Sequence, residues 1–370
     1  MAVTPHQMDA ISSQIQESYQ QLEMDILKMF IERLKKKGVT QDGVFKWQIE
    51  RMQELRMINS ETIKKASQVA KISKNQLKQM VLANGGVIAD DMKSELDKMG
   101  LSASGKNNLD NVLSSLYKEA YQNMNSYVNA GMMTDDINRN VATQAYRNVV
   151  NSTLNRVASG LQTFDEAMSS SMYELADNGL NSSFISKSGR TWSQDVYMRQ
   201  LLSTTAHRTF NDARAEVMKD YNIELMSMSE HVASRESCAQ VQGRVVDMTP
   251  DHKHPDYPNV WDYGYREPAG VDGINCRHVF FPFIEGVNYV DDPKYTPEEA
   301  TRNGKIQQTQ RANEREIRQS KRKLELAQKM GDKKGIAKYQ ARVQLFQAKQ
   351  RDLINKHKFL SRDYLRERSS

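Results

Sequence analysis

The feature that most constrains the fold is an apolar stripe at helical spacing near the N-terminus. Thr4 and Gln7 suit a capping box, and Lys35-Lys36-Lys37-Gly38 suits a helix end. Between them, apolar side chains recur at steps of three and four residues: Met8, Ile11, Ile15, Tyr19, Leu22, Ile26 and Met29. This spacing puts them on one face of a single helix. The pattern therefore predicts a long helix that buries one side against other elements.

The same texture continues through the first half of the chain. Amphipathic segments cover 43–58, 107–130 and 134–178. Ser73-Lys74-Asn75-Gln76 reads as a further capping box, opening a helix that stops near Asn84-Gly85-Gly86. We interpret residues 1–180 as a helical docking region.

Residues 181–292 have a different pattern, which predicts a small α+β module. A helix is expected over 193–220, followed by short strands near 223–229, 243–246 and 279–281, with a proline-rich loop over 249–275. Both cysteines and four of the seven histidines lie between 231 and 278. The module is therefore where chemistry is expected.

Residues 293–370 predict a basic helical hairpin. Two polar helices, about 297–330 and 334–357, flank the turn Gly331–Gly335, and they can pair with each other or with another chain. The whole chain is thus expected to be predominantly α with a small α+β module: a long N-terminal helical region, a compact Cys/His-containing module and a C-terminal basic hairpin.

Composition excludes some classes of protein. No run approaches about 18 consecutive apolar residues, so no membrane span is expected. The N-terminus, MAVTPHQMDA, lacks the basic and apolar regions of a secretory signal. Two cysteines are too few for a disulfide framework, so a reducing compartment is expected.

Charge is distributed unevenly along the chain. Residues 301–370 hold 20 Lys+Arg and 7 Asp+Glu, a balance of +13. The totals are 52 and 46, so the first 300 residues hold 32 minus 39, or −7. A basic segment of this kind favours contact with nucleic acid or with an acidic partner.

Three stretches together form a specific pattern. The first is Ser229-Glu230-His231-x3-Arg235-Glu236-x-Cys238-x3-Gln242-Gly243, and the second is Gly273-Ile274-Asn275-Cys276-Arg277-His278 with the later Pro282. The third is the tail ending Leu360-Ser361-Arg362-Asp363-Tyr364-Leu365-Arg366-Glu367. With the helical N-terminal region they resemble the phage minor capsid protein 2 family and, more distantly, Mu F-type head-morphogenesis proteins. Those proteins often close the motif with a second cysteine, where this chain has His278.

The resemblance implies a structural minor capsid protein of a tailed bacteriophage, not an enzyme. It implies a protein made in the bacterial host cytoplasm and built into the virion, inside the capsid near the portal vertex. The expected partners are the portal protein or other capsid proteins and packaged double-stranded DNA, bound without sequence preference.

Four residues of the module have the side chains of a structural zinc site: His231, Cys238, Cys276 and His278. Zinc would hold together a module with little core of its own. The residues alone leave other interpretations open. Both cysteines can act as small buried hydrophobes, with the histidines bonded to the backbone, and a Cys238–Cys276 disulfide would need oxidising surroundings.

Two enzymatic interpretations also arise from the module. Asp251-His252-Lys253-His254-Pro255 is reminiscent of a zinc-dependent nuclease, although Asn275 and His278 lack the spacing and the ββα context of such enzymes. Cys276 near His278 has the residue types of a thiol nucleophile but no Gly-rich oxyanion turn. The alternative function is therefore a nucleic-acid-directed enzyme in 181–292 that is delivered with the DNA.

The hairpin supplies the candidate contacts to DNA or to an acidic partner. Rows of cations neutralise phosphates and release counterions, giving sequence-independent and salt-sensitive binding, while a solvated helical face would show the same charges. The candidates are Lys321, Arg322, Lys323, Lys333, Lys334, Lys338, Arg342, Lys349, Arg351, Lys356 and Lys358.

Overall fold

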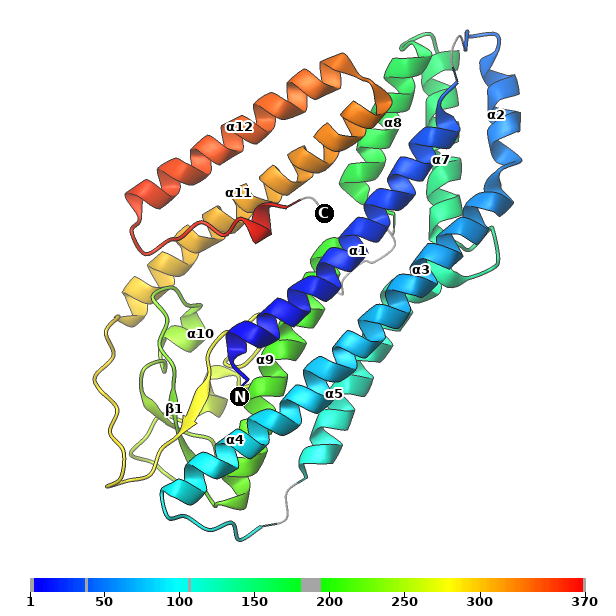
Figure 1. Cartoon of the computed structure of the whole chain (residues 1–370). Coiled ribbons are helices and arrows are strands. Elements are labelled where there is room, and N and C mark those ends of the chain that lie inside the picture. The colour runs from blue at the N-terminus through cyan, green and yellow to red at the C-terminus, as the bar shows by residue number, and fades with distance from the viewer. Residues whose placement is uncertain (1–2, 37–38, 106–107, 181–193, 369–370) are drawn as a thin grey trace. The chain divides into compact units, whose positions relative to one another are not determined.

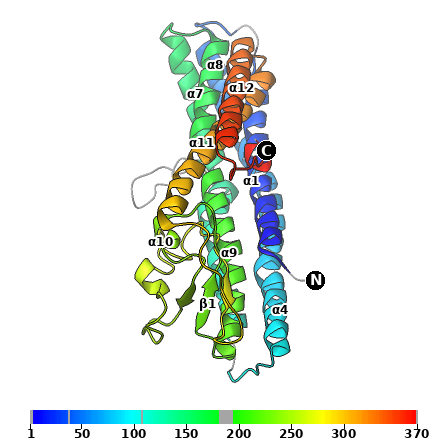
Figure 2. The ribbon, with the colours of Figure 1, turned by 90° about the vertical axis from the view of Figure 1, so that its left-hand side faces the viewer.

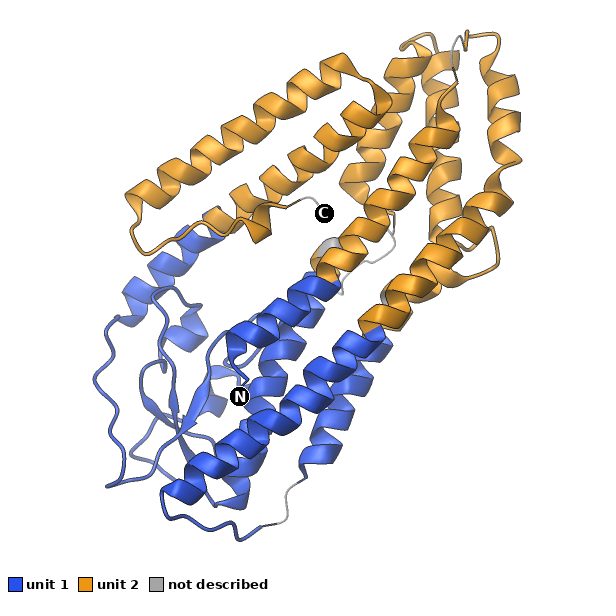
Figure 3. Ribbon diagram, viewed as in Figure 1, with its two compact units in different colours: residues 1–15, 74–122, 199–309 blue, residues 16–73, 123–198, 310–370 orange. Residues whose placement is uncertain are grey.

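The computed structural model describes residues 3–36, 39–105, 108–180 and 194–368. It is mainly helical with one small antiparallel sheet, which confirms the predicted fold class (Figure 1). The chain forms two compact units that interleave along the sequence (Figure 3). Unit 1 comprises 1–15, 74–122 and 199–309, and unit 2 comprises 16–73, 123–198 and 310–370. The three consecutive regions expected from composition stay a prediction.

The N-terminal helix α1 (Pro5–Leu34) forms as its apolar stripe predicts. The Thr4 backbone N–H donates to Gln7 Oε1 at 2.9 Å, and the Gln7 N–H donates to Thr4 Oγ1 at 3.3 Å, which completes the capping box. Stripe residues such as Ile15 and Ile26 are fully buried. The continuous stripe therefore sets both the length of α1 and the face it buries.

Unit 2 is built from helices packed around a buried tryptophan. Besides residues 310–370, its elements are the later part of α1, α2 (Val44–Met52), α3 (Leu55–Lys78, as far as 73), η2 (Asn125–Asn129), α6 (Ala130–Met133), α7 (Val141–Ala158) and α8 (Phe164–Asn178). Trp47 donates its indole N–H to the Leu34 carbonyl at 3.1 Å and meets Phe164 edge-on at 5.0 Å. Burying a side chain of this size contributes roughly 3 kcal/mol.

Two of the predicted amphipathic segments, 43–58 and 134–178, are each divided into two helices. A turn at Gln53–Glu54 separates α2 from α3, and the turn before Thr163 separates α7 from α8. Gly160 takes a φ of +70° in the second turn, a conformation that glycine adopts without strain. Thr163 and Glu166 then form a capping box that starts α8.

The predicted helix boundary at Ser73 and stop at Gly85 are wrong. Ser73 lies buried inside α3, and the helix continues through η1 (Gln79–Ala83) into α4 (Asn84–Lys98). Gly85 packs beneath Leu113 of α5 (Leu109–Met124), where an added Cβ would come closer than 3.0 Å to the leucine. The glycine therefore serves close helix packing, which outweighs its low helix propensity.

Unit 1 contains the sheet, and its predicted strands are confirmed. The strand order is β2 (Val245–Asp247), β1 (Leu225–Met228) and β3 (Phe280–Pro282), with both pairs antiparallel. Met226 of the central strand lies opposite Val246 on one side and Pro282 on the other. Helix α9 (Gln194–Asp220), the short α10 (Glu236–Ala239) and η3 (Val260–Tyr263) complete the module.

The C-terminal hairpin consists of α11 (Pro297–Met330) and α12 (Lys333–Lys356), as predicted, followed by η4 (Leu365–Glu367). The two helices run antiparallel in both views (Figures 1 and 2). Asp332 caps α12 by accepting the Gly335 backbone N–H at 2.9 Å. Of the helices in the described ranges, none is long and apolar enough to cross a membrane.

Candidate metal centre and candidate nucleic-acid interface

Three of the four predicted zinc ligands meet in the core of unit 1. The sulfurs of Cys238 and Cys276 lie 3.9 Å apart, and Cys276 Sγ lies 3.4 Å from His278 Nδ1. Within the described part of the chain this is the one group of three metal-ligating side chains that converge, and all three are buried. The long loop between the two halves of the motif therefore brings its ends together.

Local structure explains how these side chains meet. Cys238 lies on the single turn α10, while Cys276 and His278 follow a tight turn that leads into β3. The turn requires glycine at position 273, because a Cβ there would lie closer than 3.0 Å to the Glu267 carbonyl oxygen. The side chain of Asn211 on α9 donates to Asp272 Oδ1 at 2.9 Å and to the His278 carbonyl at 3.0 Å.

The distances fit tetrahedral zinc. Bond lengths of about 2.3 Å to sulfur and 2.0–2.1 Å to nitrogen place two sulfurs about 3.8 Å apart, and a sulfur and a nitrogen about 3.6 Å apart. The observed separations, 3.9 Å and 3.4 Å, are close to both values. The donor set, two thiols and an imidazole, also suits zinc.

The second nitrogen of His278 is oriented as in metal-bound histidines. His278 Nε2 lies 2.9 Å from Gln242 Oε1, so the ring can donate there and leave Nδ1 free to act as a ligand. Gln242 also donates through Nε2 to the His231 carbonyl at 3.0 Å, and its Oε1 accepts a hydrogen bond from the Ser234 hydroxyl. The sequence placed Gln242 only in a turn, and its role as the buried hub of this network was not predicted.

His231, the fourth predicted ligand, lies beside the group. Its ring centroid is 4.5 Å from that of His278, in an edge-on arrangement, and its Nε2 lies 3.1 Å from the Arg277 carbonyl. Burial lowers the pKa of His231, which favours the neutral imidazole. Its assignment as a ligand stays a prediction, since this nitrogen faces the backbone.

The two thiols have different acidities. The hydrogen bond with Cys238, followed by the contact with His278, lowers the pKa of Cys276 well below its ordinary value although burial opposes this. The same hydrogen bond and burial raise the pKa of Cys238. Cys276 is therefore the sulfur that more readily becomes the thiolate that metals and oxidants require.

The loop that suggested a nuclease is held by neighbouring carboxylates. His254 Nε2 lies 3.0 Å from Glu224 Oε2, and Lys253 pairs with the same carboxylate. His252 Nε2 lies 3.6 Å from Asp262 Oδ1, with both side chains about half exposed. The segment continues into the 3₁₀ turn η3 rather than into a ββα unit. These contacts hold a surface loop in place.

Several of the predicted DNA-contacting cations form ion pairs inside unit 2. Arg322 lies 2.8 Å from Glu23, and Lys323 lies 2.6 Å from Asp177. Lys334 lies 3.1 Å from Glu166, and Arg342 lies 2.6 Å from Glu316. Burial lowers the pKa of Lys321, whose side chain is only partly exposed. Part of the positive charge of the hairpin therefore serves its own packing.

The other candidates, together with the ion-paired Arg342, lie exposed on α12 and just beyond it. Lys338, Arg342, Lys349 and Lys356 are spaced by four, seven and seven residues, which puts them on one face of the helix. Eighteen residues of helix span about 27 Å. The remaining exposed candidates are Lys333, Arg351 and Lys358. We call the four aligned cations the α12 row.

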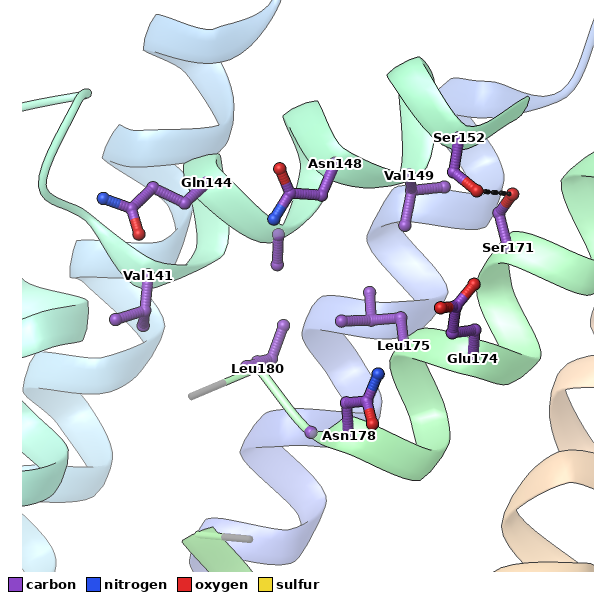
Figure 4. A pocket seen from close by; sticks show the side chains of 12 residues that line it. Val141, Gln144, Asn148, Val149, Ser152, Ser171, Glu174, Leu175, Asn178 and Leu180 are labelled. Atoms are coloured by element: carbon purple, nitrogen blue, oxygen red, sulfur yellow. Dashed lines mark hydrogen bonds between the residues drawn. The ribbon is translucent and has the colours of Figure 1, made fainter. Parts of the chain in front are cut away.

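A hollow of about 240 Å³ lies between α7 and α8, and Figure 4 shows the side chains that line it. Of the lining residues, Ser171 donates its hydroxyl to Ser152 Oγ at 3.1 Å, and Glu174 pairs with Arg156 outside the hollow at 3.0 Å. The hollow is smaller than the roughly 300–1,000 Å³ of small-molecule pockets. We interpret it as loose packing between two helices.

A helical chain with a small tied module and a basic hairpin has the features of a structural protein that assembles with other macromolecules. The chain belongs to the phage minor capsid protein 2 family, whose model matches residues 3–355. This confirms the resemblance inferred from the sequence. It makes the chain a structural protein of a phage particle, as the relatives' names indicate.

Two relatives are both described as a structural protein. That of Lactococcus phage LL-H is 32% identical over 334 residues, covering 88% of this chain and 89% of the relative. That of Lactococcus phage mv4 is 41% identical over 115 residues, covering 31% of this chain and 94% of the relative. No solved structure matches the chain.

Proposed function

We propose that this capsid protein is placed inside the phage head near the portal vertex, where its hairpin contacts packaged DNA. The observation that carries the DNA contact is the α12 row. Its members are exposed and aligned over about 27 Å. The position near the portal is supported by the family resemblance alone.

Duplex binding by the full chain tests the DNA contact. Because each phosphate contact contributes about 0.9 to the slope of log affinity against log salt, replacing Lys338, Lys349 and Lys356 by glutamine should lower that slope by about 2.7. A matched control replaces three exposed residues of the same helix that carry no charge: Gln340, Gln344 and Asn355, each to Ala. If the triple glutamine variant binds duplex like the control at low salt, the DNA contact is refuted.

The portal position has its own test. An asymmetric reconstruction of the head vertex should show density for this protein beside the portal ring on the inner surface. The same protein spread over the whole shell, or on the outer surface, would refute the placement.

We further propose that Cys238, Cys276 and His278 hold a structural zinc ion. The sulfur and nitrogen separations near tetrahedral values and the Gln242 partner of His278 support this assignment. Zinc would connect α10 to the irregular segment that leads into β3, and thus connect the two halves of the motif.

Metal analysis of the purified full chain tests the zinc site. A single zinc ion per chain is expected, and Cys276→Ala should remove it, whereas Ser237→Ala, next to Cys238, should retain it. Folded wild-type protein that is free of metal refutes the site. Protein whose two cysteines are joined in a disulfide under non-reducing conditions would refute it equally.

A further inference from the structure

We propose that a pocket between α8, α11 and α12 binds one phosphate group of the DNA backbone. The inference deepens the proposed DNA contact and rests on it, because it names where and how a phosphate is held. The pocket has a volume of about 220 Å³ and lies within unit 2. It is lined by Asp177, Glu316, Gln319, Ser320, Lys323, Lys338, Tyr339 and Arg342.

The wall of the pocket includes a buried hydroxyl that lacks a partner. Ser320 is 1% exposed, and its Oγ has no hydrogen-bond partner among the described residues. Leaving a buried hydroxyl unbonded is unfavourable, because the group has lost its hydrogen bonds to water. A ligand that accepts a hydrogen bond in this pocket would remove that cost, so the hydroxyl indicates an acceptor group.

Three cations line the pocket, so the acceptor group should carry negative charge. The ammonium groups of Lys323 and Lys338 each lie 5.5 Å from the centre of the Tyr339 ring. The ring therefore holds both ammonium groups at the pocket, and Arg342 adds a planar guanidinium. Ammonium, guanidinium and hydroxyl donors are the usual partners of a phosphate oxyanion.

Two carboxylates share the pocket with these cations. Asp177 pairs with Lys323, and Glu316 pairs with Arg342, so the formal balance is +1. Their side chains are 48% and 34% exposed. Pairs exposed to this degree are weak, so a phosphate can displace both carboxylates toward solvent while the cations stay in place.

The source of the phosphate follows from what surrounds the pocket. Lys338 and Arg342 begin the α12 row, which continues through Lys349 and Lys356. Between 338 and 356 the chain has one carboxylate, Asp352, against the four cations of the row. Such a row suits a polyanion charged at regular short intervals, as DNA is. An acidic protein surface would need a carboxylate row of matching length.

Competition between inorganic phosphate and a labelled DNA duplex tests the pocket in the full chain. At matched ionic strength, phosphate should displace duplex from the wild-type protein more strongly than chloride does. Ser320→Ala should raise the dissociation constant of phosphate about fivefold and Lys338→Gln about tenfold. Glu316→Gln should lower it about threefold, because a competing carboxylate is lost.

Lys358→Gln is the matched control, since Lys358 is exposed and lies outside the pocket. It should lower the salt slope of duplex binding by about 0.9, as Lys338→Gln does, and leave phosphate binding unchanged. Circular dichroism melts of every variant establish that the helices are retained.

Each contrary outcome identifies what fails. If duplex binds but Ser320→Ala and Glu316→Gln leave phosphate binding unchanged, the pocket is refuted and the DNA contact stands. If phosphate binds with the expected dependence but duplex does not, the DNA source and the proposed function are both refuted. If a poly-glutamate peptide displaces phosphate more strongly than duplex does, the occupant is an acidic protein and the proposal is wrong.

Discussion

The guanidinium of Arg277 donates a hydrogen bond to the carboxylate of Asp9 at the start of α1. Arg277 is the middle residue of the Cys-x-His step, so the backbone that carries two proposed zinc ligands also anchors the N-terminal helix. His207 of α9 lies 3.4 Å from the same carboxylate. Three segments far apart in the sequence thus meet around Asp9, all within unit 1.

Acid should weaken this contact. Burial alone would raise the pKa of Asp9. The hydrogen bond from His207 and the charge of Arg277 outweigh burial and lower this pKa to about 2, against an ordinary 3.8. A lowered pKa means that the stabilisation is present above about pH 4 and is lost as the pH falls toward 2. The Asp9 side chain is 32% exposed, so solvent screening reduces the effect. The expected contribution of its ionised form to the free energy of unfolding is about 1–2 kcal/mol.

Urea unfolding at several pH values measures this effect. Asp9→Asn should be less stable than wild type at pH 7 and should show a smaller loss of unfolding free energy between pH 4 and 2. Asp110→Asn, at an exposed position on α5, is the control and should follow the wild type. An unchanged pH dependence in Asp9→Asn contradicts the argument.

Two histidine variants should differ in metal binding. His278 offers Nδ1 to the sulfurs and is held by Gln242, whereas Nε2 of His231 faces the Arg277 carbonyl. His278→Gln should therefore release zinc. His231→Gln should retain it, with an affinity reduced about 10- to 100-fold if the residue supports the site from outside. Competition with a chromogenic chelator measures both, and equal loss in the two variants would make His231 a direct ligand.

Two cations of the hairpin should differ in their effect on stability. The Arg322–Glu23 pair has side chains only 15% and 2% exposed, and Glu23 also accepts the Leu180 backbone N–H at 3.0 Å. Arg322→Gln leaves a buried carboxylate without its counter-charge and should cost about 3–5 kcal/mol. Lys334→Gln breaks an exposed pair and should cost less than about 1 kcal/mol. Thermal unfolding compares them, and equal effects would show that Arg322 is not a structural residue.

Two Gly→Ala substitutions in helices should have opposite effects. In Gly335→Ala the new methyl would lie closer than 3.0 Å to the Tyr173 hydroxyl, at the place where that hydroxyl donates to Asp332 at 2.7 Å. A loss of about 1–3 kcal/mol is expected from overpacking. A Cβ at Gly86 of α4 meets nothing within 4 Å, so Gly86→Ala should stabilise by about 0.5–1 kcal/mol. Unfolding free energies of the two variants with the same sign would contradict this.

Much of the fold could be predicted because its signals are local. The two hairpin helices and the three short strands follow from periodicity and from turn residues only a few positions away. The failed boundary at Ser73 shows the limit. A capping box and a Gly-Gly pair predict a boundary, but the burial of Ser73 and the packing of Gly85 under Leu113 keep the helix continuous. Such packing depends on a segment that lies elsewhere in the chain.

Some residues of the candidate sites could be predicted from the sequence, and others could be recognised only in the structure. Residue types alone identified Cys238, Cys276 and His278, because thiols and imidazoles near a turn are rare in this chain. The hub role of Gln242 and the hydroxyl of Ser320 could not be predicted, since glutamine and serine occur throughout the sequence. Only their burial and bonding partners distinguish them.

The sequence by itself determined the helical character, the positions of the hairpin and strands, the family and the excess of positive charge at the C-terminus. These follow from short-range periodicity, composition and motif. Only the tertiary structure decided which cations pair with carboxylates, and that three candidate ligands converge within the distances of a zinc site. The physical reason is that both depend on long-range packing, which brings together side chains that no local pattern relates.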